Sequence, residues 1–218
     1  MIRGLIFDLD GVLVDTAKYH YLAWKRLCAE LGYKFDINDN ELLKGVSRIR
    51  SFEIILEINN VTKTPEEIEH YCGIKNGYYL EYIRRLTEDD ILPGAKEFLE
   101  DAKRLGYKLA LGSASKNSRL ILDRLKIEDM FDAIIDGTKV QSAKPDPEVF
   151  LKGAAELGLK PEECIVFEDS AAGITAARNG HMRPVGVSNP EIRDYCDYFI
   201  RSFAETTAEV LVKKVTGE

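Results

Sequence analysis

Two aspartates stand two residues apart directly after the first apolar segment of the chain. The segment 2–7 is short and mainly apolar, and Asp8 and Asp10 follow it. A run of this kind is typical of a buried strand in a parallel sheet. Two carboxylates at one strand end need a cation or a shared proton to coexist. The pair therefore indicates either a Mg²⁺ site in which one aspartate is a nucleophile, or a strand-ending turn with two surface acids.

Other polar groups follow later apolar runs in the same way. Taken alone, Glu168 and Asp169 favour a helix N-cap at Asp169 or Ser170, but together with Asp8 and Asp10 they add oxygen ligands of the kind that Mg²⁺ prefers. Ser113 stands close to the start of the next helix, where a hydroxyl suits either a phosphoryl oxygen or an ordinary cap. Lys144 precedes a proline in a loop, where it is either solvated or offsets the charge of a phosphoryl group in transfer.

Apolar runs alternate with helical patterns through most of the chain. We expect strands at 2–7, 108–111, 133–135, 164–167 and 184–187, and helices at 93–106, 117–126, 147–158 and 170–180. This alternation predicts an α/β fold with a doubly wound, mainly parallel sheet, which binds its ligands at the carboxyl ends of the strands. The last 30 residues carry no informative motif.

The segment 15–90 interrupts the alternation with helical patterns and no convincing strand. An apolar stripe along 17–31 ends at Gly32, and the sequence at 64–67, Thr-Pro-Glu-Glu, predicts the capped start of a second long helix that extends towards Leu86. We therefore predict two domains, an α/β core formed by 1–14 and 91–218, and an all-helical cap formed by 15–90.

The composition excludes several classes of partner. The 218 residues carry a net charge of −7, which argues against broad binding to nucleic acid or to an anionic membrane. The four cysteines are far apart and form no C-x-x-C motif, so we expect buried thiols in a reducing compartment. We find no segment that resembles a signal peptide or a membrane span, and we expect a cytoplasmic monomer.

The strand-end residues resemble, in order and position, the four motifs of the haloacid dehalogenase superfamily. They are Asp8-Leu9-Asp10-Gly11-Val12, Ser113, Lys144 and Glu168-Asp169. The resemblance implies that Asp8 is the nucleophile that becomes an aspartyl phosphate and that Asp10 is the general acid and base. It further implies Mg²⁺ held by Asp8, the Asp10 backbone carbonyl, Glu168 and Asp169, with Ser113 and Lys144 on the phosphoryl group.

Within that superfamily the chain resembles the β-phosphoglucomutase family over about residues 1–190. This resemblance depends on four features: His20 and Trp24 after the first motif, the loop 44–48, the segment 113–117 and Lys144-Pro145. It implies roles in catalysis for Thr16 and His20, and substrate contacts from Lys44, Gly45, Val46, Ser47, Arg48, Ser51, Lys75, Ala114, Ser115, Lys116 and Asn117. Arg48 would bind the phosphate distal to the metal, whereas the flanks of Lys75 depart from the family pattern. From the residues alone, His20 also suits a structural helix histidine, and Lys44 with Arg48 a solvated loop.

The family resemblance implies a magnesium-dependent isomerase of carbohydrate metabolism. Its small-molecule partner would be a sugar phosphate, with β-D-glucose 1-phosphate and β-D-glucose 6-phosphate interconverted through an aspartyl phosphate and β-glucose 1,6-bisphosphate. A phosphatase acting on a small sugar phosphate or a similar metabolite is the nearest alternative. A phospho-acceptor like a response-regulator receiver and a degenerate binding protein are the more distant ones.

Overall fold

Six parallel strands form a single sheet in the computed structural model, which describes residues 1–43 and 47–217. The strand order is β3-β2-β1-β4-β5-β6, so β1 lies at the centre between β2 and β4. The strands are β1 (Gly4–Phe7), β2 (Lys108–Gly112), β3 (Ala133–Ile135), β4 (Cys164–Glu168), β5 (Arg183–Val187) and β6 (Tyr198–Ile200). This order reverses direction at β1, which places the carboxyl ends of β1, β2 and β4 side by side at one edge of the sheet.

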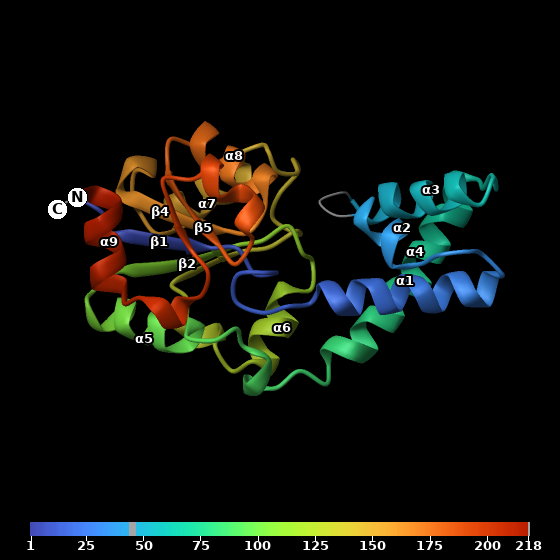
Figure 1. The fold of residues 1–218 in the computed structure, drawn as a ribbon, viewed down its shortest axis with the longest axis horizontal. Coiled ribbons are helices and arrows are strands. Elements are labelled where there is room, and N and C mark those ends of the chain that lie inside the picture. The colour runs from blue at the N-terminus through green and yellow to red at the C-terminus, as the bar shows by residue number, and fades with distance from the viewer. Residues whose placement is uncertain (44–46, 218) are drawn as a thin grey trace. The chain divides into compact units, whose positions relative to one another are not determined.

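Helices cover both faces of the sheet, with α5 and α9 on one face and α7 and α8 on the other (Figure 1). The α-helices are α1 (Ala17–Leu31), α2 (Ile37–Glu41), α3 (Arg48–Ile58), α4 (Pro65–Ile83), α5 (Ala95–Arg104), α6 (Ser118–Arg124), α7 (Glu148–Glu156), α8 (Ala171–Asn179) and α9 (Ala208–Thr216). Short 3₁₀ helices are η1 (Glu88–Asp90), η2 (Glu128–Met130), η3 (Pro161–Glu163), η4 (Pro190–Tyr195) and η5 (Phe203–Glu205). The predicted doubly wound α/β fold is confirmed.

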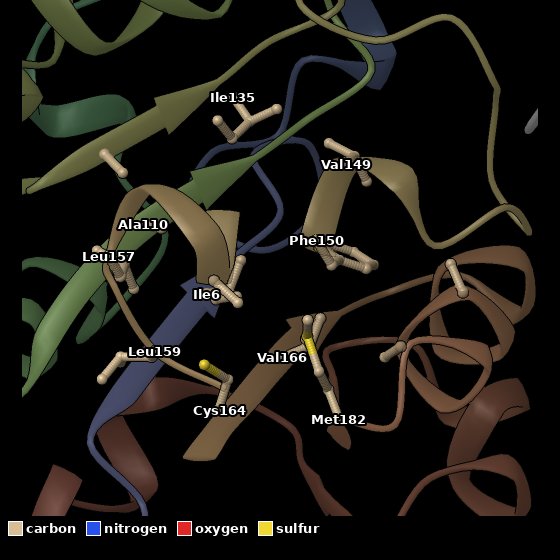
Figure 2. Packing of buried hydrophobic residues seen from close by; sticks show 14 residues of the cluster. Ile6, Ala110, Ile135, Val149, Phe150, Leu157, Leu159, Cys164, Val166 and Met182 are labelled. Carbon is tan, nitrogen blue, oxygen red and sulfur yellow. The ribbon is translucent and has the colours of Figure 1, made fainter. Parts of the chain in front are cut away.

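The central strand is buried on both faces, which explains why its sequence is a continuous apolar run rather than an alternating one. Ile6 packs against Phe150 of α7 and Val166 of β4 on one side (Figure 2). On the other side the ring of Phe7 stacks on Phe167 with 4.5 Å between centroids, and the edge of Phe98 from α5 meets it at 6.2 Å. Strand β1 is therefore fixed in register, and the position of Asp8 at its end is fixed with it.

The chain divides into two compact units, Thr16–Arg85 and the remainder, Met1–Asp15 with Leu86–Glu218. The segment leaving the larger unit pairs with the segment that re-enters it, because Val14 and Ile91 form an antiparallel bridge. The sequence placed the limits of the inserted domain at 15 and 90. In the structure, residues 86–90, which include η1, belong with the sheet-containing unit.

Within its described residues the smaller unit contains the helices α1 to α4, joined by turns and loops, and no strand. Helix α1 packs on α4, and the ring of Trp24 stacks on that of Phe52 from α3 with 5.8 Å between centroids. Helix α1 ends where Gly32 adopts a left-handed φ of 71°, as its position after the apolar stripe predicts. The predicted capping box opens α4, with the Thr64 hydroxyl and the Glu67 side chain each accepting from the other residue's backbone N–H, but the helix ends at Ile83 rather than at Leu86.

Two elements at the end of the chain were not predicted. Strand β6 adds three residues to the edge of the sheet, and α9 packs against α5. The buried face of α9 consists of Ala208, Leu211, Val212 and Val215, a helical spacing that the sequence does contain. None of the described helices is both long and apolar enough to cross a membrane. Cys28, Cys72 and Cys164 are buried free thiols, as expected, whereas Cys196 is partly exposed.

Phe98 supplies a test of this packing. The side chain is 2% exposed and contacts Phe7, Phe167 and Phe203, so Phe98→Ala should lower the free energy of unfolding by about 3–5 kcal/mol. Urea unfolding monitored by circular dichroism measures the change. Leu105→Ala, at a 37%-exposed position just after α5, is the matched control and should change it by less than about 1 kcal/mol. Equal effects of the two variants would contradict this account of the core.

Candidate active site

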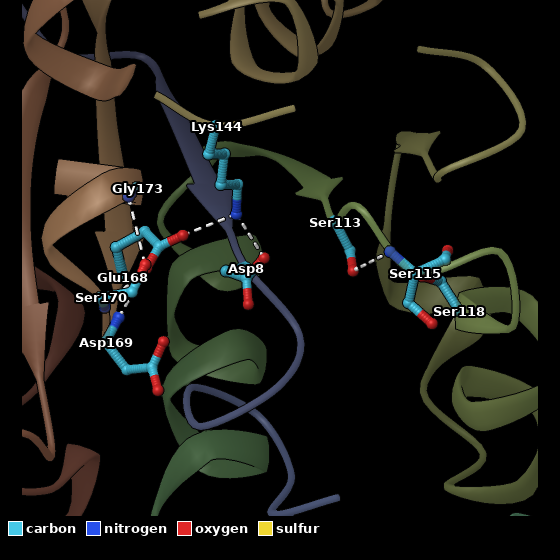
Figure 3. Close-up of polar contacts among 9 residues, drawn as sticks. All are labelled: Asp8, Ser113, Ser115, Ser118, Lys144, Glu168, Asp169, Ser170 and Gly173. Carbon is cyan, nitrogen blue, oxygen red and sulfur yellow. Dashed lines mark hydrogen bonds and ion pairs between the residues drawn. The ribbon is translucent and has the colours of Figure 1, made fainter. Parts of the chain in front are cut away.

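Lys144 joins the ends of two neighbouring strands. Strands β1 and β4 pair with Phe7 opposite Phe167, so Asp8, the residue after β1, and Glu168, the last residue of β4, lie at the same level of the sheet. The Lys144 ammonium lies 2.6 Å from Asp8 Oδ1 and 2.6 Å from Glu168 Oε1 (Figure 3). All three side chains are almost inaccessible to solvent, with at most 12% exposed. The lysine that the sequence leaves as either solvated or functional is therefore the buried counter-ion of the acidic cluster.

The second oxygen of Glu168 is fully engaged by the start of α8. Oε2 accepts hydrogen bonds from the backbone N–H groups of Asp169 (2.8 Å) and Ser170 (2.8 Å) and from the Ser170 hydroxyl (2.9 Å). Ser170 also caps α8, because its Oγ accepts from the Gly173 N–H at 3.1 Å. A Cβ on Gly173 would lie 1.8 Å from Glu168 Oε1, so only glycine leaves room for this carboxylate. Ser170 is thus the helix cap that the sequence allowed, and Glu168 belongs to the cluster.

Asp169 lies against the turn that follows β1. Gly11 has a φ of 77°, and a Cβ there would lie 2.1 Å from Asp169 Oδ2. The backbone carbonyl of Asp169 accepts a hydrogen bond of 2.9 Å from the Asn189 side-chain amide. Glycine at position 11 therefore serves both the left-handed turn and the close approach of this carboxylate.

Ser113 begins a series of hydroxyl-stabilised turns after β2. Its buried Oγ accepts from the Ser115 N–H at 3.1 Å, Ser115 Oγ accepts from the Asn117 N–H at 3.3 Å, and Ser118 Oγ donates to the Ser115 carbonyl at 2.8 Å. Ser113 is therefore not the cap of α6, whose N-cap position is occupied by Asn117. Figure 3 shows Ser113 on the opposite side of Asp8 from Glu168, as the strand order requires. The exposed residues Ala114 and Lys116 belong to the same loop.

A second group of predicted site residues lies in the smaller unit. Lys75 of α4 is 2% exposed, and its ammonium lies 2.8 Å from Nδ1 of His20 on α1. The same ammonium lies over the rings of Trp24 and Tyr79, 4.9 Å and 5.2 Å from their centroids, and the His20 ring stacks on Tyr79 at 4.1 Å. An ammonium can only donate, so Nδ1 of His20 is the acceptor and its Nε2 carries the proton. The sequence placed these residues in two helices without predicting their contact.

Burial lowers the pKa of His20 well below its usual range, and the positive charges of Lys75 and Arg48 lower it further. Burial also lowers the pKa of the Arg48 guanidinium. Arg48 is the first residue of α3, where the Ser47 hydroxyl caps the helix by accepting from the Arg50 N–H, and the buried Ser51 hydroxyl donates to the Ser47 carbonyl at 3.0 Å. The unit therefore gathers two cations around a neutral imidazole.

Thr16 occupies the N-cap position of α1 and is completely buried. Its hydroxyl makes no capping hydrogen bond, so helix capping does not explain why a threonine stands here. Its role in catalysis stays a prediction. The predicted residues Lys44, Gly45 and Val46 lie outside the described part of the chain.

A family model of haloacid dehalogenase-like hydrolases matches residues 2–181. The chain belongs to this family. It is 41% identical over 212 residues to a β-phosphoglucomutase of Bacillus subtilis, a match that covers 96% of this chain and 94% of that protein. The crystal structure of a β-phosphoglucomutase from Clostridium difficile is similar with a TM-score of 0.92 and 41% identity, covering 100% of this chain and 98% of that one. A fructose-1-phosphate phosphatase of Escherichia coli is 31% identical over 186 residues, 84% of this chain and 95% of that protein.

In this haloacid dehalogenase-like chain, the strand-end cluster carries more negative charge than Lys144 neutralises. Burial, together with the charges of Glu168 and Asp10, outweighs the lowering effect of Lys144 and raises the pKa of Asp8 to about 7. Burial, Glu168 and Asp8 raise the pKa of Asp169 to about 8. Burial alone would lower the pKa of Lys144, but the two carboxylates in contact with it outweigh that effect and raise it.

The haloacid dehalogenase-like relatives imply a metal cofactor, and the donor chemistry of the cluster fits one. Asp8 and Asp169 offer hard oxygens of the kind that Mg²⁺ prefers, and burial together with the neighbouring carboxylates raises their pKa values, so that a bound cation would favour the ionised form of both. Glu168 is already engaged by Lys144 and by three donors at the start of α8. Accordingly, over residues 1–43 and 47–217 no three His, Cys, Asp or Glu side chains are grouped as a metal site in the present arrangement.

Sequence reasoning missed the residues that support the haloacid dehalogenase motifs. Ser170 and Gly173 shape the position of Glu168, and their spacing of a serine three residues before a glycine was visible but suggested only a cap. Tyr79 follows Lys75 by four residues on one helix, a spacing that could have indicated their contact. Asp136, buried after β3, resembles the motif acids in sequence but accepts from the Thr138 N–H and forms a turn.

The neutral state of His20 predicts a pH dependence of stability. The folded state binds fewer protons at this ring than the unfolded state once the pH falls below about 6.5, so stability decreases as the pH falls from there towards the folded pKa. In His20→Asn the amide oxygen can replace Nδ1 as the acceptor for Lys75 and does not titrate. The free energy of unfolding should therefore change less between pH 7 and pH 5 in this variant than in the wild type. Urea unfolding at the two pH values measures this change. If the free energy of unfolding changes equally in the variant and in the wild type, His20 is not a neutral buried residue.

Proposed function

We propose that the protein is a β-phosphoglucomutase. It interconverts β-D-glucose 1-phosphate and β-D-glucose 6-phosphate through an aspartyl phosphate at Asp8 and a β-glucose 1,6-bisphosphate intermediate. The observation that carries the proposal is electrostatic: the strand-end cluster is acidic around one lysine, whereas Arg48 and Lys75 make the helical unit locally cationic around the neutral His20. An intermediate with two phosphates needs one anchor for the phosphate in transfer and another for the phosphate at rest.

The chemistry begins with the Asp8 phosphoenzyme and β-glucose 1-phosphate. Asp10 accepts the proton of the 6-hydroxyl as that oxygen takes the phosphoryl group, and the bond between Asp8 and phosphorus breaks. The bisphosphate then exchanges its two ends. Asp8 attacks the phosphate at C1, the bond between phosphorus and the sugar oxygen breaks, and Asp10 returns its proton to that oxygen.

Asp8 is well placed to be the nucleophile because β1 and its packing hold it in one position. Lys144, which contacts Asp8, and Ser113, which follows the neighbouring strand β2, contact the oxygens of the phosphoryl group, and Lys144 offsets its charge. Asp10 belongs to the turn beside Asp8 and is the general acid and base. Mg²⁺, which would be held by Asp8, the Asp10 carbonyl, Asp169 and a rearranged Glu168, supplies the positive charge that neutralises the phosphoryl oxygens and favours ionised Asp8.

The resting phosphate binds Arg48, whose guanidinium can donate two parallel hydrogen bonds. His20, held by Lys75, presents its Nε2 proton to the ligand, and Thr16 and Ser51 support this side of the site. Further contacts come from Ala114, Ser115, Lys116 and Asn117, and from Lys44, Gly45, Val46 and Ser47. We expect a monomer to suffice because every proposed residue lies in one chain.

A phosphatase is the second candidate, because a relative that is 31% identical hydrolyses fructose 1-phosphate according to its name. Water would then take the place of the sugar hydroxyl in attacking the aspartyl phosphate. Exclusion of water from the site favours transfer to sugar over hydrolysis.

A coupled assay distinguishes the two activities. With Mg²⁺ and a trace of glucose 1,6-bisphosphate, the wild type should convert β-glucose 1-phosphate to glucose 6-phosphate faster than it releases inorganic phosphate, and it should be inactive on the α anomer. Asp8→Asn should reduce turnover by about 10⁴-fold or more while the circular dichroism spectrum stays unchanged. Phosphate release that exceeds isomerisation would favour the phosphatase, and substantial turnover by Asp8→Asn would reject the nucleophile.

Arg48→Ala tests the anchor for the resting phosphate. Losing its charged hydrogen bonds should reduce kcat/KM for β-glucose 1-phosphate by about tenfold to a hundredfold, with a much smaller effect on hydrolysis of p-nitrophenyl phosphate, which has one phosphate. Arg50→Ala, two residues along the same helix at an arginine engaged by Glu53 and Glu57, is the matched control and should leave both rates unchanged. Equal losses of both activities in Arg48→Ala would refute the distal-phosphate role.

A further inference from the structure

Lys144 lies in the loop that joins β3 to α7, nine residues after the end of β3 and four residues before the first residue of α7. Its ammonium is fixed by Asp8 and Glu168, but these contacts only fix the tip of a long, flexible side chain. When a phosphoryl group enters, the tip must turn to the ligand, and the position of the backbone then decides where the charge lies. What holds the loop is therefore relevant to the chemistry.

Glu148, the first residue of α7, binds the part of the loop that precedes Lys144. Its Oε2 accepts hydrogen bonds from the backbone N–H groups of Gln141 at 2.9 Å and Ser142 at 2.7 Å. Its Oε1 accepts from the Lys152 ammonium at 2.6 Å, one helical turn further along α7. One carboxylate thus links the loop to a helix that packs on the central strands of the sheet.

The same helix start fixes the loop at two more points. Lys152 donates a second hydrogen bond, of 2.6 Å, to the carbonyl of Lys139. After Lys144, the Asp146 side chain accepts from the Glu148 N–H at 2.9 Å, and the Asp146 N–H donates to the Ala143 carbonyl at 3.0 Å. The backbone is therefore held on both sides of Lys144. The Glu148 carboxylate binds the loop before it, and the Glu148 N–H binds the Asp146 side chain after it.

The Glu148 carboxylate is ionised throughout the working pH range. The hydrogen bonds from Lys152, Ser142 and Gln141 lower its pKa to about 2. Charge-assisted hydrogen bonds of this kind are stronger than neutral ones, and two of them fall on adjacent loop amides. Helix α9 offers a comparison, because Glu209 in its first turn forms the same pair with Lys213 four residues later, at 2.8 Å. Within the described residues no loop amide donates to Glu209.

We propose that Glu148 is a positioning residue that acts through Lys144. By holding the amides of Gln141 and Ser142, it fixes the loop so that the Lys144 ammonium reaches the phosphoryl group in transfer. This inference rests on the proposed function only in assigning Lys144 to that group. A misplacement of about 1 Å in such a group can reduce the rate by about 10²-fold.

The loop contact is measured first, without any substrate. Hydrogen–deuterium exchange at the amides of Gln141 and Ser142 should be markedly faster in Glu148→Ala than in the wild type. It should be unchanged in Glu209→Ala, which loses the same kind of ion pair. Unchanged exchange in Glu148→Ala would overturn the proposal at its first step.

Turnover is measured next, with β-glucose 1-phosphate and with p-nitrophenyl phosphate as the probe that needs no sugar recognition. Glu148→Ala should lower kcat by about 10²-fold on both substrates, while Glu209→Ala keeps the wild-type rates. Glu148→Gln, whose amide oxygen can still accept from both loop amides, should recover most of the activity. If Glu148→Ala matches the Glu209→Ala control, or if the Gln variant is as slow as the Ala variant, the positioning role is wrong.

A double-mutant cycle separates action through Lys144 from general loss of structure. With p-nitrophenyl phosphate, adding Glu148→Ala to Lys144→Ala should cause little further loss of rate, because the group that Glu148 positions is already gone. Additive losses would indicate a structural effect and overturn the proposal. If the wild type hydrolyses p-nitrophenyl phosphate but does not isomerise β-glucose 1-phosphate, the proposed function fails while the cycle still decides the role of Glu148. Should Glu148→Ala not fold, Lys152→Met, which removes the lysine that holds the Glu148 carboxylate and the Lys139 carbonyl, takes its place in the exchange, turnover and cycle measurements, with the same expected and overturning results, and Glu148→Gln remains the conservative comparison.

Discussion

The contact between one buried ammonium and two buried carboxylates is the constraint on which the rest of the structure depends. Asp8, Asp10, Glu168 and Asp169 all lie at the carboxyl ends of adjacent parallel strands, and an uncompensated cluster of this kind would not remain ionised inside a protein. Lys144 neutralises part of the charge, yet burial first and the neighbouring carboxylates second still raise the pKa values of Asp8 and Asp169. A further positive charge near these oxygens would favour their ionised forms.

Most of the unusual local geometry around the cluster serves to bring these groups together. Gly11 and Gly173 lack the Cβ atoms that would collide with Asp169 and Glu168, and Ser170 both caps α8 and donates to Glu168. These residues make no contact that a sequence motif would name as catalytic. Gly173 and Ser170 nevertheless decide whether Glu168 can reach Lys144, because a displacement of this carboxylate would break its ion pair of 2.6 Å. Gly11 in turn decides how closely Asp169 can approach the turn after β1.

The sequence predicted the sheet and the motif positions because continuous apolar runs, each ended by a polar residue, have few structural interpretations in an α/β protein. It did not predict β6, since three residues at a sheet edge, of which only Ile200 is fully buried, give too short a signal. The residue types of the site were predictable, but their contacts were not. No rule about sequence spacing predicts that Lys75 contacts His20 on another helix. Nor does one predict that Lys144 bridges the ends of two strands instead of pointing into solvent.

The two units differ in the sign of the charge that they bury. The charge of each unit restricts the kind of ligand that it can bind. In the helical unit, Lys75 is buried against two aromatic rings and donates a hydrogen bond to Nδ1 of a neutral imidazole, an arrangement that keeps a positive charge without neutralising it. Arg48 adds a second partly buried cation close enough to lower the pKa of the same imidazole. Burying cations is costly unless an anion compensates them in the working state. The sheet-containing unit has the opposite excess. Taken by itself, the charge of the helical unit favours an anionic group as its ligand, whereas the acidic cluster at the strand ends favours a cation.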